Sequence, residues 1–154
     1  MEANMAAVIQ TTVDDINGPI RICLRGEDSD DAFSLVDEMI PPGYGPPLHV
    51  HPSFAEGFYV LQGQLTFQLG DDVVTGAAGS WIYIPKDTAH TFANLSRHPA
   101  RALLICSPAG FERNFERILA EHAGRLVPEP SAAMRETYVV GPRIEGTLDV
   151  PLLS

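Results

Sequence analysis

Residues 43–63 of the chain read GYGPPLHVHPSFAEGFYVLQG. The stretch places two histidines, His49 and His51, two positions apart, and on a β-strand residues with this spacing point to the same face. Glu56 follows after a short loop through Pro52, and this loop can return the carboxylate to the same point. Two imidazoles and one carboxylate form a ligand set that suits a divalent transition metal with open coordination positions.

The spacing of the two histidines is weak support by itself, because two hydrogen-bonded histidines on a strand without a metal give the same pattern. A second stretch strengthens the support for a metal site. It covers residues 79–94, which read GSWIYIPKDTAHTFAN. Together the two stretches resemble the motifs of the cupin superfamily, G(X)5HXH(X)3–4E(X)6G and G(X)5PXG(X)2H(X)3N. The first motif is matched at every position, by Gly43, His49, His51, Glu56 and Gly63. The second motif is matched by Gly79, Pro85, His90 and Asn94.

One position of the second motif departs from the pattern, since Asp87 stands where the motif has glycine. Aspartate adopts left-handed turn conformations more readily than most residues, and the position is not a ligand. The resemblance implies a jelly-roll β-barrel with a metal ion inside, held by His49, His51, Glu56 and His90. Three neutral imidazoles and one carboxylate leave one or two positions on the ion for water, substrate or dioxygen. The ion itself stays open between iron, nickel, cobalt, manganese and zinc.

Turn residues divide the first two thirds of the chain into short strand-like segments. Residues 65–69 alternate between apolar and polar side chains, which is the period of a strand with one buried face. The predicted strands cover residues 8–13, 20–25, 33–40, 58–61, 65–69, 73–75, 81–84, 90–94 and 101–107. Many short strands at this spacing indicate an all-β sandwich or barrel. The acidic residues 27–31 are expected to form a solvated loop, because their spacing is not that of a calcium-binding loop.

A single domain over residues 1–154 is expected, with a barrel core over about residues 33–107. One C-terminal helix follows the barrel, predicted over about residues 111–123. Phe111, Phe115, Ile118 and Leu119 form its apolar stripe, and Gly124 supplies the C-terminal stop. A second short helix around residues 131–137 is possible after the proline pair that precedes it.

Aromatic side chains are expected to make the interior of the barrel apolar. Strand parity places Phe58 on the side of Glu56 and Phe92 on the side of His90. The predicted substrate pocket consists of Phe54, Phe58, Phe67, Phe92 and either Trp81 or Tyr83. Each of these side chains taken separately also fits ordinary core packing. Together they favour a flat or hydrophobic organic ligand over a sugar or phosphate, because neither motif carries an arginine to bind an anion.

A longer set of residues resembles the bacterial single-cupin proteins that are grouped with quercetin 2,3-dioxygenase. Residues 56–67, 107–115 and 138–142 carry this likeness. It implies a metal-dependent dioxygenase for an enolisable aromatic or flavonol-like substrate. In this chemistry the substrate hydroxyl loses its proton, O2 attacks the activated ring, and the heterocycle opens with loss of carbon monoxide. Glu56 would act there as a metal ligand and as the general base.

Two other functions stay open on the same scaffold. One is a polyketide cyclase or isomerase in which the metal only polarises a carbonyl, and the other is a non-catalytic cupin that binds or stores a small molecule. The expected partners are a small aromatic substrate, O2 and a second copy of the chain, since single-cupin proteins of this type usually pair. In such a homodimer the strand over residues 8–13 could add to the sheet of the neighbour.

The charge of the chain argues against two classes of partner. The sequence has 20 acidic and 10 basic residues and a formal net charge of −10. Nucleic acids and anionic membranes attract basic patches, so neither is expected to bind. The N-terminal residues lack the basic and apolar regions of a signal peptide, and Cys23 and Cys106 show no paired spacing. These features predict a cytoplasmic protein with two reduced thiols.

Overall fold

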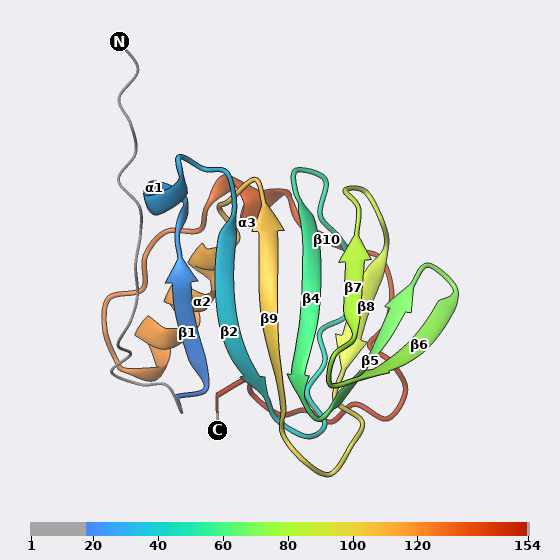
Figure 1. Ribbon diagram of the computed structural model, residues 1–154. Coiled ribbons are helices and arrows are strands. Elements are labelled where there is room, and N and C mark those ends of the chain that lie inside the picture. Colours follow the sequence, from blue (N-terminus) through green and yellow to red (C-terminus); the bar gives the residue numbers. More distant parts are fainter. Residues whose placement is uncertain (1–17, 154) are drawn as a thin grey trace.

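In residues 18–153, the part of the chain that the computed structural model describes, ten strands form two antiparallel five-stranded sheets (Figure 1). The first sheet has the order β1 (Ile20–Leu24), β2 (Ser34–Ile40), β9 (Ala100–Ser107), β4 (Ala55–Gln62) and β7 (Trp81–Ile84). The second sheet has the order β10 (Tyr138–Val139), β3 (His49–Val50), β8 (His90–Ala93), β5 (Gln64–Leu69) and β6 (Asp72–Ala77). Pairs such as β2 and β9 join distant parts of the sequence, as in a jelly roll, and the predicted all-β class is confirmed. The predicted strand over residues 8–13 lies outside the described residues.

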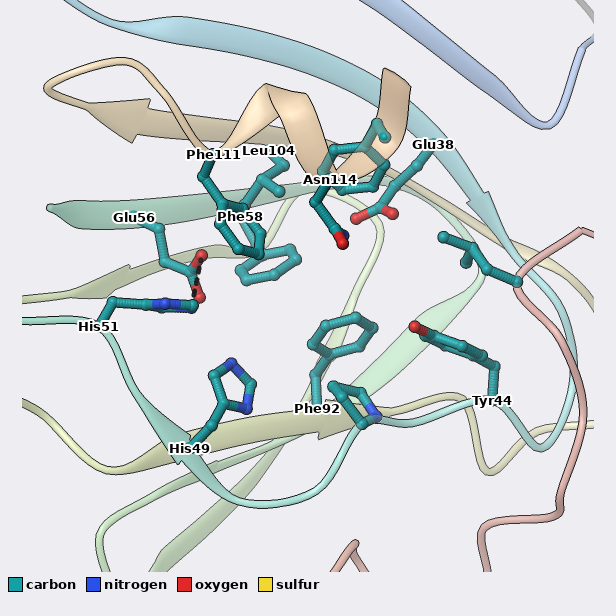
Figure 2. Close-up of a pocket in the computed structure, with 13 residues that line it drawn as sticks. Glu38, Tyr44, His49, His51, Glu56, Phe58, Phe92, Leu104, Phe111 and Asn114 are labelled. Atoms are coloured by element: carbon teal, nitrogen blue, oxygen red, sulfur yellow. Dashed lines mark ion pairs between the residues drawn. The ribbon is translucent and has the colours of Figure 1, made fainter. Parts of the chain in front are cut away.

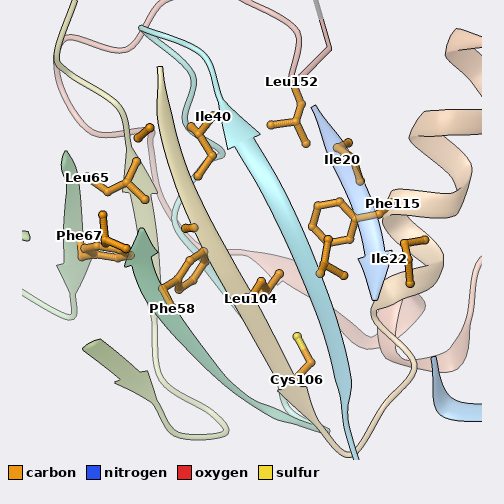
Figure 3. Close-up of a cluster of buried hydrophobic side chains, with 14 of the residues drawn as sticks. Ile20, Ile22, Ile40, Phe58, Leu65, Phe67, Leu104, Cys106, Phe115 and Leu152 are labelled. Carbon is orange, nitrogen blue, oxygen red and sulfur yellow. The ribbon is translucent and has the colours of Figure 1, made fainter. Parts of the chain in front are cut away.

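Alternation along the strands decides which side chains face the barrel interior. In β9 every second side chain from Ala100 to Cys106 is buried, and the residues between them are half-exposed. The register of β2 on β9 pairs Val36 with Leu104 and Glu38 with Ala102, so these side chains share the inner face. Apolar side chains from both sheets meet there in one cluster (Figure 3). Glu38 and Glu56 are the two glutamates on the inner face of the first sheet.

Three helices of the described part of the chain lie outside the sheets, and they are α1 (Gly26–Ser29), α2 (Glu112–His122) and α3 (Ala132–Glu136). α2 confirms the helix predicted over residues 111–123. Its Phe115 joins Ile20 and Ile22 of β1 in the buried cluster, which holds the helix against this edge of the sheet (Figure 3). The possible second helix is present as α3, and the Ser131 hydroxyl caps it by accepting from the backbone N–H of Met134. None of the helices in residues 18–153 is long and apolar enough to cross a membrane.

The acidic residues 27–31 differ from the prediction, because the chain forms one helical turn, α1, before it reverses. The Asp28 carboxylate accepts from the backbone N–H of Arg25 at 3.1 Å, which caps the first turn. Asp30 ends the turn in the left-handed conformation with φ of 52°. The prediction of a loop throughout is therefore wrong for the first half of this segment, since the acidic residues act as helix caps.

The segment after α3 returns across the barrel and closes it. β10 pairs with β3, and the backbone N–H of Leu148 donates to the carbonyl of Gly43 at 2.8 Å. A side chain at Gly43 would collide with Leu148, and φ at Gly43 is +85°. The glycine of the first motif therefore leaves room for the tail, the segment that follows α3. Leu152 and Leu153 are buried near the C-terminal end. The tail is therefore part of the barrel wall beside β3.

Candidate metal centre

The four predicted ligands converge on one point between the two sheets. His49 of β3 lies opposite His90 of β8 in the second sheet, His51 follows β3 directly, and Glu56 comes from β4 in the first sheet. One donor atom from each of these residues lies within 4.8 Å of the others. His51, Glu56 and His90 are buried, and His49 is half-buried. Figure 2 shows His49, His51 and Glu56 at one end of a cavity.

Backbone carbonyls fix the orientation of two imidazole rings. The Nδ1 atom of His49 lies 2.6 Å from the Pro47 carbonyl oxygen, and Nδ1 of His90 lies 2.7 Å from the Thr88 carbonyl oxygen. A carbonyl can only accept, so each Nδ1 carries the hydrogen and donates it. The Nε2 atom of each ring is then the one that faces the centre, which is the arrangement found around bound metals.

The ring of His51 is held by a side chain from the tail. Its Nδ1 lies 2.7 Å from the Thr137 hydroxyl, and that hydroxyl donates to the Ala133 carbonyl at 2.9 Å. Because the hydroxyl hydrogen is already used, the Thr137 oxygen accepts the hydrogen on His51 Nδ1. Sequence analysis did not find Thr137, which lies 86 residues from its partner and matches no motif position.

The carboxylate of Glu56 is paired with two of the rings. Glu56 Oε1 lies 2.6 Å from His90 Nε2, and Oε2 lies 3.7 Å from His51 Nε2. Burial by itself would raise the pKa of Glu56, but the His90 hydrogen bond and the three nearby imidazoles outweigh it and lower that pKa. Burial would lower the pKa of His90, and the hydrogen bond and charge of Glu56 outweigh it and raise that pKa. A metal ion bound at His90 Nε2 would take the place of this hydrogen bond to Glu56.

The other two imidazoles are neutral. Burial lowers the pKa of His51 to about 4, and it also lowers the pKa of His49. A neutral ring is the form that binds a metal. Three imidazoles and one carboxylate, with no thiolate, fit a divalent transition metal such as iron, nickel, cobalt, manganese or zinc. The donor set and the ring orientations therefore agree on a metal centre.

The cavity next to this cluster has a volume of about 90 Å³. Two of the predicted pocket residues, Phe58 and Phe92, line it. Phe54 and Phe67 are buried behind its wall instead, where Phe54 packs between the rings of His51 and Phe111 and Phe67 packs 5.3 Å from Phe58. Phe54 and Phe67 therefore pack behind the residues that line the cavity and do not line it themselves.

Trp81 and Tyr83 lie on the opposite face of the sheet, so the prediction that one of them faces the cavity is wrong. They are 51% and 59% exposed. The register of β7 on β4 pairs Glu56 with Ile84, so Ile82 and Ile84 take the inner positions and the aromatic residues between them point outward. The indole of Trp81 lies over Gly57, where any side chain would collide with it.

Several residues line the cavity without having been predicted to do so. Tyr44 comes from the first motif, and Phe111 and Asn114 come from the start of α2. Glu38 comes from β2, where it shares the inner face with Val36. The sequence of β2 does not alternate cleanly between apolar and polar residues, so only its pairing with β9 identifies Glu38 as an inward residue. The remaining lining residues are Pro46, Leu104, Phe115 and Leu152.

The fold and the site define a jelly-roll barrel with an internal cluster of three histidines and one glutamate that can hold a metal ion. A family model described as a cupin domain matches residues 36–106, and the chain belongs to the cupin superfamily. Asp87, at the motif position that departs from glycine, has φ of 61°, in the left-handed region.

Comparison with known proteins supports this assignment. The quercetin 2,3-dioxygenase of Bacillus subtilis is 27% identical over 113 residues, which is 73% of this chain and 33% of the relative. The chain thus spans about a third of the length of that enzyme. An uncharacterized protein of Methanocaldococcus jannaschii is 30% identical over 86 residues, which is 56% of this chain and 68% of the relative. The structure of a predicted oxalate decarboxylase from Thermotoga maritima has a TM-score of 0.52 and 23% identity, covering 58% of this chain and 78% of that one.

Proposed function

We propose that the chain is a metal-dependent dioxygenase that opens an enolisable aromatic or flavonol-like compound with O2. The observation that carries this proposal is the cluster of three histidines and Glu56 at one end of a cavity with an aromatic wall. The similarity to a quercetin 2,3-dioxygenase supports the same chemistry. A single divalent transition metal is the proposed cofactor, held by His49, His51, Glu56 and His90.

Different residues of the chain would have different roles in such a reaction. When bound, the metal would supply a Lewis acid that makes a substrate hydroxyl more acidic and a centre at which O2 can react. Glu56 is ionised at neutral pH because the imidazoles lower its pKa, so its carboxylate can accept the proton of that hydroxyl. Phe58 and Phe92 exclude water from the reacting atoms, which limits the hydrolysis of reactive intermediates.

The size of the cavity limits how a substrate can bind. A volume of about 90 Å³ is below the range of roughly 300–1,000 Å³ that is usual for small-molecule sites. A second pocket of about 300 Å³ opens beside the first, and Met134, Thr137 and Val139 line its outer part. The residues that line both pockets are Tyr44, Pro46, His49, His51, Phe111 and Asn114. A flavonol-sized compound would therefore need the space of both pockets around the metal centre.

Oxygen uptake tests the proposal. Wild-type protein loaded separately with each candidate metal is supplied with 3-hydroxyflavone, and O2 consumption and carbon monoxide release are followed. We expect uptake that depends on substrate, its loss in the His49→Ala/His90→Ala variant, and its retention in His98→Ala, which changes an exposed histidine outside the cluster. Conversion of the substrate without O2 uptake would favour a cyclase or isomerase, and binding without conversion would favour a binding protein.

The homodimer implied by the resemblance is also proposed. Light scattering at micromolar concentration is expected to give twice the 16.7 kDa mass of one chain. A mass of one chain at that concentration would contradict it.

A further inference from the structure

The cavity has a second polar end, away from the metal centre. Glu38 of β2 is only 2% exposed and lines the cavity. Its Oε1 atom is buried and has no hydrogen-bond partner among the described residues. Figure 2 shows the Glu38 carboxyl, the Asn114 amide and the Tyr44 hydroxyl pointing into the same space. Three hydrogen-bonding groups from three different elements thus converge there.

Four buried side-chain atoms of the described residues have no hydrogen-bond partner, and of these only Glu38 Oε1 belongs to a residue that lines the cavity. The amide of Asn94 is fully buried and donates to the carbonyls of Ile40 and His98, at 3.0 and 2.8 Å. The buried carboxylate of Glu112 accepts from the backbone N–H groups of Gly26 and Gly110. A buried carboxyl oxygen without a partner is costly to the fold, so its position beside a cavity calls for a ligand.

An apolar band separates this end from the metal centre. Glu38 and Glu56 belong to the inner face of the same sheet, with β9 between their strands. The register places Glu38 in the row of Ala102 and Val60, and Glu56 four residues before Val60 on β4. Phe58 and Leu104 fill the row between the two glutamates. A ligand that reaches both ends must therefore cross this apolar band.

The second end is uncharged at neutral pH. Apart from the histidines of the metal centre, no cationic side chain of the described residues lines the cavity. Burial raises the pKa of Glu38 to about 8, and the negative charges of Glu56 and Asp37 add to the effect. Burial also raises the pKa of Tyr44 to about 12. The carboxyl is then a neutral acid that offers one O–H donor and one acceptor oxygen, and Tyr44 and Asn114 offer further donors and acceptors.

We infer that Glu38, Tyr44 and Asn114 form a second binding point, which takes an uncharged hydroxyl or carbonyl group of the substrate while its enolisable oxygens lie at the metal centre. This inference rests on the proposed function and narrows its substrate class. A phosphate or carboxylate at this position would be buried beside a carboxyl with no cation to pair with it, so substrates with an anionic far end are excluded.

Binding of matched ligands to zinc-loaded protein tests the inference, because zinc has no redox chemistry and binding is then measured alone. The probes are 3-hydroxyflavone and two derivatives that carry either a hydroxyl or a carboxylate on the ring farthest from the chelating oxygens. In wild type we expect the hydroxyl derivative to bind about tenfold more tightly than 3-hydroxyflavone, as one buried hydrogen bond allows. We expect the carboxylate derivative to bind more weakly than 3-hydroxyflavone.

Two substitutions at Glu38 separate its hydrogen bonding from its bulk. Glu38→Leu removes the polar group and should abolish the tenfold preference for the hydroxyl derivative, whereas Glu38→Gln keeps a neutral donor and acceptor and should retain most of it. Tyr44→Phe, which removes only a hydroxyl, should lose part of the preference. Circular dichroism and zinc content equal to wild type establish that each variant is folded. An unchanged preference in folded Glu38→Leu would overturn the inference.

Oxygen uptake separates this result from the proposed function. Ligand preferences as expected with no O2 uptake on any metal would overturn the dioxygenase and leave the binding point supported. Uptake as expected with equal binding of all three ligands would overturn the binding point and leave the dioxygenase supported.

Discussion

The two ends of the cavity each present a buried glutamate, and the two carboxyls are in opposite states. Glu56 and Glu38 are 4% and 2% exposed and lie on the inner face of one sheet. Imidazoles surround Glu56 and lower its pKa, whereas burial raises the pKa of Glu38 to about 8 and the carboxylates of Glu56 and Asp37 add to this rise. Burial is the same at both ends, so the neighbours decide the charge. One end is therefore suited to a cation and the other to a neutral polar group.

The largest expected effect is on catalysis at the end of the cavity that holds Glu56, which is the charged end. Glu56→Gln cannot accept a proton, so turnover by fully metal-loaded variant should fall by about 100- to 10,000-fold, which is the usual contribution of a general base. Substrate that is already ionised at high pH should recover part of the loss. Turnover is measured against pH after metal content has been confirmed, with Glu38→Gln as the matched glutamate at the other end. Near-wild-type turnover of Glu56→Gln at full occupancy would remove the base role and favour carbonyl polarisation.

Protonation of Glu38, at the neutral end of the cavity, should make the free energy of unfolding depend on pH. Burial raises the pKa of Glu38 in the folded protein to about 8, whereas in the unfolded chain its carboxyl has the ordinary glutamate pKa of 4.5. The folded state therefore binds more protons between these values, and the contribution of Glu38 to stability falls as pH rises through this window. Between pH 5.5 and 7.5 the loss should approach about 2–3 kcal/mol, from ~1.4 kcal/mol per pH unit.

Urea unfolding of metal-free protein measures this loss. Glu38→Gln does not titrate, so the difference in unfolding free energy between wild type and this variant should change with pH by the expected amount. Glu129→Gln, which changes an exposed glutamate, serves as the control and should parallel wild type. Parallel profiles for wild type and Glu38→Gln would show that Glu38 is already ionised, and the contrast between the two ends would disappear.

A smaller effect is expected from the support of His51. Thr137→Val keeps the shape of the side chain and removes the oxygen that accepts from His51 Nδ1. Metal affinity should fall by about 10- to 100-fold, as is common when an outer hydrogen-bond partner of a ligand is removed. Thr137→Ser retains the hydroxyl and should bind metal much like wild type. Competition with a chelator gives the affinities, and equal affinity in Thr137→Val would show that the ring needs no such support.

The smallest effect concerns the outer face of the sheet. Trp81 is the only tryptophan of the chain, and it lies outside the cavity. The wavelength of its emission maximum should therefore change little when 3-hydroxyflavone binds in the cavity. The spectra are corrected for light that the ligand itself absorbs. Tyr44→Trp, combined with Trp81→Phe, places the reporter at the cavity and should respond strongly. A large response of Trp81 in wild type would contradict its position on the outer face.

Much of the charged end was visible in the sequence, and the neutral end was not. The spacing within one strand and its following loop indicated His49, His51 and Glu56, and the resemblance of both motifs to the cupin superfamily implied the full set with His90. Glu38 depends on how β2 pairs with β9, which is a long-range register that local patterns do not contain.

Other differences have the same origin. The parity of β7 was ambiguous, because its apolar and aromatic residues alternate and either set could face inward until the pairing with β4 is known. Thr137 reaches His51 only because the tail returns to β3. Most of the strands and α2 were predicted because their turns and apolar periods are local, whereas β10 was not predicted, because it forms only by pairing with β3.

Metal stoichiometry tests the central claim most directly. Apo-protein is loaded with a divalent transition metal at neutral pH, excess ion is removed, and native mass spectrometry counts the ions that each chain retains. We expect one ion per chain in wild type and in His98→Ala, and almost none in His49→Ala/His90→Ala. Retention of one ion per chain by the double variant would contradict a metal centre at this cluster, as would a wild-type chain that retains none of the five candidate metals.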